Sequence, residues 1–259
     1  MEFLAETAFL TRGLACLSNE ELAQAWPYDD AVFVWLDNGR ITRGTMQEYL
    51  PFRSRALDLP RLDCMALQDA RKAKVSASLT ASGTMAACQE LGIDLAVTCG
   101  MGGVGKIKAE QICADLPALA TYTVALLASS PKDMLDIPAT ISWLTDREIH
   151  VVGPACTGWV FNGDPVPVPE SWAQYPDADA IRKAALEDGI LLLNPIPAER
   201  RIADRSILAS AIDAGLKAEA DGGDYHPAAN AEIHRLTDGC SAKLQLQAFI
   251  DNMKLARSL

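Results

Sequence analysis

The sequence predicts a layered α/β fold. Segments of strand and helix composition alternate over most of the chain, several strand segments are wholly apolar, and one of them runs into a loop with four glycines. Ligands of open α/β sheets bind at the carboxyl ends of strands. Glycine turns there let backbone amides approach a ligand, because no Cβ intervenes. We therefore expect the functional site to lie around residues 98–116.

The first half of the chain supplies the strand that leads into this loop. An apolar run over 31–36 ends in Asp37-Asn38-Gly39, which is the composition of a strand followed by a turn. Residues 83–91 have helical composition, and a buried strand is predicted over 93–98. The glycine loop then runs over 98–106.

A further buried strand is predicted over 122–127, with a helix directly after it. Ser130 suits the N-cap of this helix, Pro131 its first position, and Asp133 could reach back as in a capping box. Lys132 would then lie at the second helical position, just beyond the carboxyl end of a strand.

The second half continues the alternation. Strands are predicted over 150–152 and 189–193, and helices over 177–187, 201–219, 227–236 and 241–258. Residues 158–173, rich in Pro, Gly and Trp, predict an irregular loop or flap. The chain has no repeat and no low-complexity linker, so residues 1–259 are predicted to form a single domain.

The composition excludes several classes of protein. Apolar residues make up 49% and charged residues 22% of the 259, and no apolar run approaches the length of a membrane span. The start of the chain lacks the basic region of a secretion signal. Seven scattered cysteines without a CxxC pair predict reduced thiols in a cytoplasmic protein. A net charge of −11 disfavours nucleic acid as a partner.

Lys132 and Glu6 are the candidate catalytic residues. The positive end of a helix would lower the pKa of Lys132, which would suit a Schiff-base nucleophile toward a sugar aldehyde. The alternative is a surface lysine paired with Asp133 or Asp136. Glu6 lies in a mostly apolar segment, where a carboxyl group has a raised pKa and suits a general acid. The alternative for Glu6 is a solvated helix face.

Other polar residues are weaker candidates. Asp115 could orient a ligand or hold a metal ion, although an acidic residue near a helix end is more often solvated. Arg53 and Arg55 could clamp a phosphate, although two loop arginines are usually only hydrated. The three histidines lack the spacing of metal ligands and are predicted to be structural or exposed.

Seven segments, in order, resemble motifs of the pseudouridine-5′-phosphate glycosidase family, which includes the indigoidine-cluster A proteins. The matching segments are Glu6-Thr7-Ala8, 80–85, 98–106, 111–116, 131–136, Asn194-Pro195-Ile196-Pro197 and 235–239. Their order holds over nearly the whole chain, and Asn-Pro-Ile-Pro at this separation from the glycine loop is hard to obtain by chance.

The resemblance implies reversible cleavage of the C–C glycosidic bond of pseudouridine 5′-phosphate to uracil and ribose 5-phosphate. It implies a glycosidase of the carbon–oxygen lyase class. The family's Schiff-base lysine falls on Lys132 and its proton-donating glutamate on Glu6. The implied fold is a three-layer α/β/α sandwich with a central mixed β-sheet, assembled as a homotrimer.

The resemblance also supplies the other expected site residues. The substrate-binding positions are Ala81, Arg53, Arg55, Gly102, Gly103, Cys113, Ala114, Asp115 and Asn194. The family's divalent metal, typically Mn²⁺, falls on Gln111 and Asp115. Gln111 replaces an aspartate, and a neutral amide is a poorer ligand for a hard cation. The family's phosphate-binding lysine is missing, and we expect Arg53 or Arg55 to take its role.

Two alternatives remain beside this function. One is a divergent, metal-independent enzyme that acts on another ribosyl-nucleobase or on an unphosphorylated sugar. The other is a non-catalytic protein that binds a nucleoside or a sugar phosphate, because fold analogy alone does not establish catalysis. Reaction of Lys132 with an aldose phosphate separates the enzymes from the binding protein.

Overall fold

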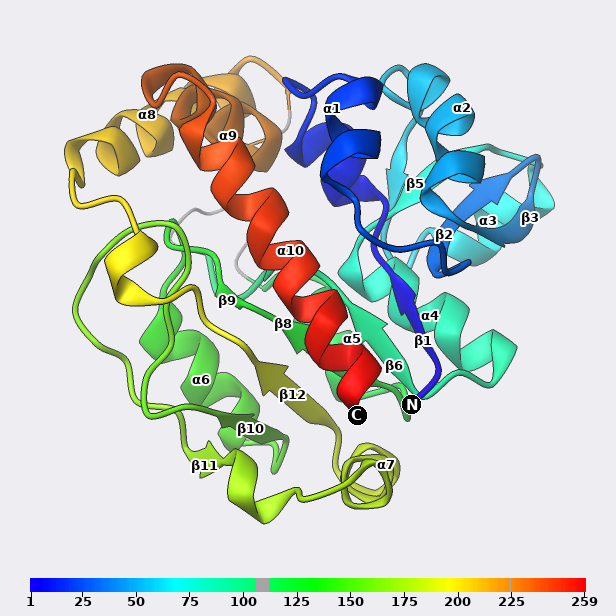
Figure 1. The fold of residues 1–259 in the computed structure, drawn as a ribbon, viewed down its shortest axis with the longest axis vertical. Coiled ribbons are helices and arrows are strands. Elements are labelled where there is room, and N and C mark those ends of the chain that lie inside the picture. Colours follow the sequence, from blue (N-terminus) through cyan, green and yellow to red (C-terminus); the bar gives the residue numbers. More distant parts are fainter. Residues whose placement is uncertain (106–111, 224) are drawn as a thin grey trace.

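A mixed β-sheet forms the centre of the computed structural model, which describes residues 1–105, 112–223 and 225–259 (Figure 1). Its strands lie in the order β11-β10-β12-β8-β6-β1-β2-β5-β4, with β3 paired to β2. The β2–β3 and β2–β5 pairs are antiparallel and the other pairs are parallel. The strands are β1 (Phe3–Ala5), β2 (Phe33–Asp37), β3 (Arg40–Gly44), β4 (Arg61–Leu62), β5 (Ala77–Leu79), β6 (Leu95–Val97), β8 (Ala125–Ala128), β10 (His150–Gly153), β11 (Glu170–Ser171) and β12 (Ile190–Leu193).

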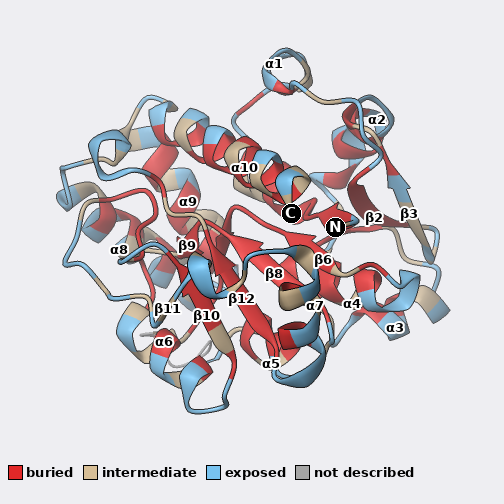
Figure 2. Cartoon of the chain, turned by 60° about the horizontal axis from the view of Figure 1, so that its bottom comes forward, coloured by how far each residue is buried: buried red, intermediate tan, exposed pale blue. Residues whose placement is uncertain are grey.

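Helices cover both faces of this sheet. They are α1 (Asn19–Ala25), α2 (Met46–Ala56), α3 (Leu67–Lys72), α4 (Ala81–Leu91), α5 (Asp115–Leu119), α6 (Ile137–Thr145), α7 (Ala178–Glu187), α8 (Ser206–Ala220), α9 (Tyr225–Leu236) and α10 (Cys240–Ser258). Figure 2 shows the buried sheet beneath helices whose outer surfaces are exposed.

Alternation of side chains along the strands creates two separate cores. Phe3 and Ala5 of β1 pack with residues of α1, α2 and α7–α10, whereas Leu4 points to the opposite face and packs with residues of α3–α6. Successive side chains of a strand point to opposite faces, so an apolar strand feeds both cores. The predicted three-layer α/β/α sandwich with a mixed sheet is confirmed.

Most of the predicted elements are present, with boundaries shifted by a few residues. The apolar run over 31–36 forms β2, and the turn after it has positive φ angles at Asn38 and Gly39. The sequence pattern predicted no element before that run. In the structure this part contains β1, which is only three residues long, and a π-helical turn (Phe9–Gly13) after it. Such short elements carry too few residues to show a period.

The predicted helix start at Ser130 is wrong. Ser130 and Pro131 form strand β9, which pairs with β7 (Gly100–Met101), and the helix begins only after Asp136, whose carboxylate accepts a hydrogen bond from the Ala139 amide at 3.0 Å. Pairing with the glycine loop provides the Ser130 segment with long-range hydrogen bonds that its local capping pattern could not reveal.

The loop over 158–173 is largely irregular, as predicted, but it is not a free flap. Trp159, Val160 and Phe161 are buried, and a short 3-10 turn follows β11 at its end. All seven cysteines are free thiols, as predicted. Among the helices of the described ranges, none is both long and apolar enough to span a bilayer.

Candidate active site

Glu6 and Thr98 lie together because their strands are parallel neighbours. Glu6 directly follows β1, Thr98 directly follows β6, and the two strands pair with Ala5 opposite Val97. Carboxyl ends of parallel strands meet at one edge of a sheet, which is where such folds bind ligands. The Thr98 hydroxyl donates a hydrogen bond to the Glu6 carboxylate.

Lys132 reaches the same edge by a different route. It follows β9, which lies in a two-stranded sheet just beyond β6 and β8, and its amide donates to the carbonyl of Met101 at 3.2 Å. Because the helix begins only after Asp136, a helix terminus does not adjoin Lys132. The predicted mechanism for activating this lysine is therefore wrong, although its position at a strand end is correct.

The environment of Glu6 gives it the character of an acid. Its side chain is almost fully buried, and this burial raises the pKa of Glu6 to about 7 against the smaller, opposing influence of the Lys132 charge and the Thr98 hydroxyl. A carboxyl group with a pKa near the working pH can donate a proton during a reaction and regain it afterwards. The expectation of a raised pKa is confirmed, and the alternative of a solvated helix face is wrong.

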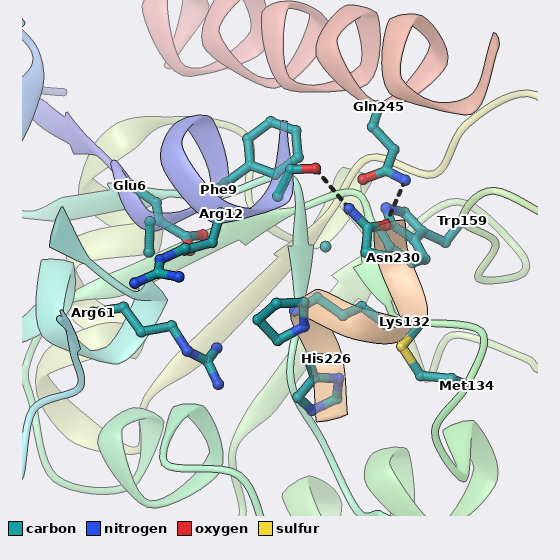
Figure 3. A pocket seen from close by; sticks show the side chains of 14 residues that line it. Glu6, Phe9, Arg12, Arg61, Lys132, Met134, Trp159, His226, Asn230 and Gln245 are labelled. Carbon is teal, nitrogen blue, oxygen red and sulfur yellow. Dashed lines mark hydrogen bonds between the residues drawn. The ribbon is translucent and has the colours of Figure 1, made fainter. Parts of the chain in front are cut away.

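Two adjoining hollows meet at Glu6 and Lys132, and Figure 3 shows the narrower of them. Both are lined by Glu6, Arg12, Arg61, Gly100, Lys132 and His226. The wider one, a cavity of about 360 Å³, also includes Pro60, Asp63, Thr80, Ala81, Ser82, Cys113, Ala114 and Asp115. The narrower one is lined further by Ala8, Phe9, Gly13, Met134, Trp159, Pro227, Asn230 and Gln245. A concave site in which charged and polar groups converge is typical of small-molecule binding.

Asp115 shapes the wall of the wider cavity. It begins α5 rather than ending a helix, and its carboxylate accepts hydrogen bonds from the amides of Ser82 at 2.9 Å and Gly102 at 2.8 Å. It therefore ties the N-terminus of α4 to the glycine loop. Ala81, Cys113 and Ala114, also predicted to bind substrate, line the same cavity.

The described residues near Asp115 do not by themselves form a site for a divalent metal ion. Each Asp115 oxygen already accepts a backbone N–H, and within the described ranges no group of three His, Cys, Asp or Glu side chains could hold a metal. Gln111, the other predicted ligand, lies outside the described residues. A hard cation of this kind requires several oxygen ligands, which the described residues here do not supply.

The glycines of the loop are required by the protein's own packing. A Cβ on Gly102 would lie 2.1 Å from the Sγ of Cys113, and one on Gly103 would lie 2.4 Å from the hydroxyl oxygen of Thr140. Neither lines the two hollows, whereas Gly100 does. The predicted close approach of Gly102 and Gly103 to a ligand is thus replaced by close approach to neighbouring side chains.

Arg53 and Arg55 are not brought to this site. Arg53 is 3% exposed and donates to the carbonyls of three residues, Leu10, Leu14 and Leu17, and to the side chain of Asn19, at 2.7–2.9 Å. Arg55 pairs on the surface with Asp37 at 2.7 Å. The predicted phosphate clamp is therefore absent from these two positions, because Arg53 instead secures residues 10–19.

We expect Arg53→Ala to lower the free energy of unfolding by about 3 kcal/mol or more, because it leaves several buried acceptors without donors. Arg55→Ala, which removes an exposed ion pair, should change it by less than about 1 kcal/mol. Urea titration of both variants tests this difference, and equal losses would contradict the structural role of Arg53.

Asn194 also lies outside the site. Its side-chain amide donates to Asn252 at 3.0 Å, and it lines a different hollow between 194–197 and the end of α10. Asn252 donates in turn to the Thr98 carbonyl at 2.8 Å. The Asn-Pro-Ile-Pro segment therefore contacts the site indirectly, through Asn252 at the Thr98 carbonyl and through the Ile196 amide, which donates to the Gly158 carbonyl at 3.2 Å.

The fold also brings here three residues that the sequence did not predict to be part of the site, namely Arg12, Arg61 and His226. Arg12 comes from the π-helical turn and Arg61 from β4, while His226 comes from the first turn of α9 and is buried. The Arg12 guanidinium donates to the Leu59 carbonyl at 2.9 Å. Arg12 lies in a short π-helical turn and Arg61 in a two-residue strand. Elements this short show no hydrophobic period, so periodicity gave no signal for either residue.

The sequence of this chain matches a family model and several known proteins. The model of the indigoidine synthase A like protein family matches residues 32–259. The chain is 30% identical to a pseudouridine-5′-phosphate glycosidase of Methylobacterium nodulans, over 98% of this chain and 81% of that protein. It is 27% identical to a protein of the same name from Petrotoga mobilis, over 86% of this chain and 76% of that protein.

Two solved structures share the fold. An indigoidine synthase A-like protein from Thermotoga maritima superposes with a TM-score of 0.74 at 21% identity, covering 98% of this chain and 90% of the other. The prealnumycin C-glycosynthase AlnA, in complex with ribulose 5-phosphate, superposes with a TM-score of 0.73 at 19% identity, covering 98% and 89%. At these identities the likeness establishes the fold alone.

Proposed function

Because this chain belongs to the indigoidine synthase A-like family, we propose that it cleaves pseudouridine 5′-phosphate reversibly to uracil and ribose 5-phosphate. The reaction is of glycosidase type and proceeds, as in a lyase, through a Schiff base on Lys132. One observation carries the proposal: the amine of Lys132 and the buried carboxyl group of Glu6 line one cavity at the carboxyl edge of the sheet.

The chemistry uses both groups in turn. The unprotonated Nζ of Lys132 bonds to C1′ of the sugar, the C1′–O4′ bond breaks, and the amine proton passes to O4′. The nitrogen lone pair then forms the iminium while the C1′–C5 bond breaks, and Glu6 donates its proton to C5 of uracil. Water hydrolyses the iminium to ribose 5-phosphate and the ammonium form of Lys132, which returns a proton to Glu6. An electron-donating nitrogen on C1′ and an acid for C5 are both needed because a carbon-bound base is a poor leaving group.

Arg12 and Arg61 are the groups we propose for the phosphate. Both line the wider cavity beside Lys132, and the Leu59 carbonyl fixes the guanidinium of Arg12. A guanidinium binds phosphate through a planar pair of N–H donors, and two of them neutralise its charge. They take the place that the sequence assigned to Arg53 and Arg55.

The direct test is release of uracil from pseudouridine 5′-phosphate, followed by chromatography, with unphosphorylated pseudouridine as the comparison. We expect equal amounts of uracil and ribose 5-phosphate from the phosphorylated substrate, and little from the other. Because the Asp115 oxygens bind amides and Gln111 is neutral, we also expect EDTA to leave the rate unchanged.

Each other outcome has a definite meaning. Loss of activity in EDTA and recovery with Mn²⁺ would show that the reaction depends on a metal, against our expectation. Preference for unphosphorylated pseudouridine would favour the divergent glycosidase. Binding of ribose 5-phosphate by folded protein, without turnover and without reaction at Lys132, would favour the non-catalytic binding protein.

A further inference from the structure

The side chain of Asp133 joins the Lys132 segment to the loop that carries Trp159. One carboxylate oxygen, Oδ2, accepts hydrogen bonds from the amides of Val160 and Phe161, both at 2.9 Å. The side chains of Val160 and Phe161 are buried in the larger core. Asp133 therefore does not cap a helix, as its sequence context predicted, but holds a loop 27 residues away.

The loop is anchored on its other side as well. The Ile202 amide donates to the Val160 carbonyl at 2.8 Å, and the Arg205 guanidinium donates to the Asn162 carbonyl at 2.9 Å. Burial raises the pKa of Asp133 to about 6, while the amides of Val160 and Phe161 and the charges of Arg201 and Arg205 act in the opposite direction. Asp133 thus lies between the loop amides and the charges of Arg201 and Arg205, and it accepts the hydrogen bonds that hold this side of the loop in place.

Trp159 is the loop residue that reaches the narrow hollow. It is 2% exposed and lies so close to Gly100 that a Cβ there would be 2.6 Å from the indole ring. Trp159, Gly100 and Lys132 all line this hollow (Figure 3). The Lys132 backbone is fixed in addition by Met101 and by the Leu135 amide, which donates to its carbonyl at 3.0 Å.

We propose that Asp133 is a positioning residue that holds the indole of Trp159 against the hollow beside Lys132 and thereby sets how Lys132 meets its substrate. This inference rests on the proposed function in one respect, that Lys132 is the reacting amine. Asp133 itself touches backbone amides and not the substrate. Its effect is exerted through the rigid link between two segments that line the same hollow, and positioning errors of this kind reduce rates steeply.

The experiment measures the Asp133 hydrogen bonds and the reaction at Lys132 separately. Hydrogen–deuterium exchange of the Val160 and Phe161 amides reports these hydrogen bonds without any substrate. Borohydride trapping of ribose 5-phosphate on Lys132, at saturating sugar, reports the chemistry. In Asp133→Ala we expect these amides to exchange at least about tenfold faster, because their acceptor is gone. We expect trapping to slow by about tenfold or more.

Asp133→Asn tests whether geometry is what matters. Its side-chain oxygen can still accept from both amides, so exchange and trapping should stay within about twofold of the wild type. Asp136→Ala is the matched control, since it removes a neighbouring carboxylate that caps α6 and does not contact the loop. It should lower stability and leave both readouts unchanged.

Trp159→Phe completes the test. If Asp133 acts through Trp159, adding Asp133→Ala to Trp159→Phe should slow trapping little further, whereas independent effects would multiply. Unchanged exchange in Asp133→Ala, equal slowing in Asp136→Ala, failure of Asp133→Asn to restore both readouts, or multiplied effects would overturn the inference. Wild-type protein with normal amide protection that is not trapped would overturn the proposed function alone.

Discussion

Replacing Lys132 by alanine is expected to lower the rate of uracil release by about 10³-fold or more, because the variant lacks the amine whose lone pair forms the iminium as the C–C bond breaks. Borohydride trapping with ribose 5-phosphate should yield an adduct on Lys132 in the wild type, located by peptide mapping, and none in the variant. Lys132→Arg keeps the positive charge but cannot form the imine, so it should be equally inactive.

A control variant and an independent pKa measurement accompany this test. Lys183→Ala removes an exposed lysine of α7 and should change neither rate nor trapping. The charge of Lys132 lowers the pKa of Glu6, so Lys132→Ala should raise that pKa further, which a carboxyl-specific infrared or NMR titration would detect. An adduct on another lysine, or normal turnover in Lys132→Ala, would remove Lys132 from the mechanism.

Glu6→Gln is expected to lower the rate by about 10²- to 10⁴-fold, the usual contribution of a positioned general acid. The amide keeps an oxygen that can accept from Thr98, so the fold should be retained. Glu2→Gln is the control, because Glu2 lies on the surface in an ion pair with Arg43 at 2.7 Å. Activity of Glu6→Gln equal to that of Glu2→Gln would show that another group supplies the proton.

The raised pKa of Glu6 also predicts how the free energy of unfolding of the wild type depends on pH. The pKa of Glu6 is about 7 in the folded state and lies above its ordinary value of 4.5. The folded state therefore binds the proton more tightly, and this stabilisation is complete below pH 4.5 and is lost as the pH rises through 7. Between pH 5 and pH 8 the wild type should lose roughly 2.5 kcal/mol relative to Glu6→Gln, which has no proton to lose at this position.

Chemical denaturation at both pH values measures this difference. His234, whose pKa is lowered by burial, titrates in both proteins and so cancels in the comparison. A constant difference between wild type and variant from pH 5 to pH 8 would mean that Glu6 ionises normally in the folded protein. Its assignment as the acid would then lose its physical basis.

The arginines show where reasoning from the sequence reaches its limit. Arg53 and Arg55 looked like a phosphate clamp because they are close together in an acidic chain, yet α2 directs Arg53 into the protein and Arg55 to its surface. Arg12 and Arg61 are 49 positions apart and meet only because β4 and the turn after β1 end at one cavity. No local pattern encodes that meeting.

The sequence by itself determined the α/β layering and the buried strands that precede Thr98 and Ser130, because apolar runs and their spacing act on residues close in the chain. A carboxyl group within an apolar segment indicated Glu6, and the resemblance to the family's motifs indicated Lys132. Tertiary structure alone decided that the segment at Ser130 is a strand, that Asp133 holds Val160 and Phe161, and that Asp115 binds backbone amides. These outcomes depend on hydrogen bonds between residues some 13 to 33 positions apart, which form only when packing has brought the segments together and can then outweigh a local preference.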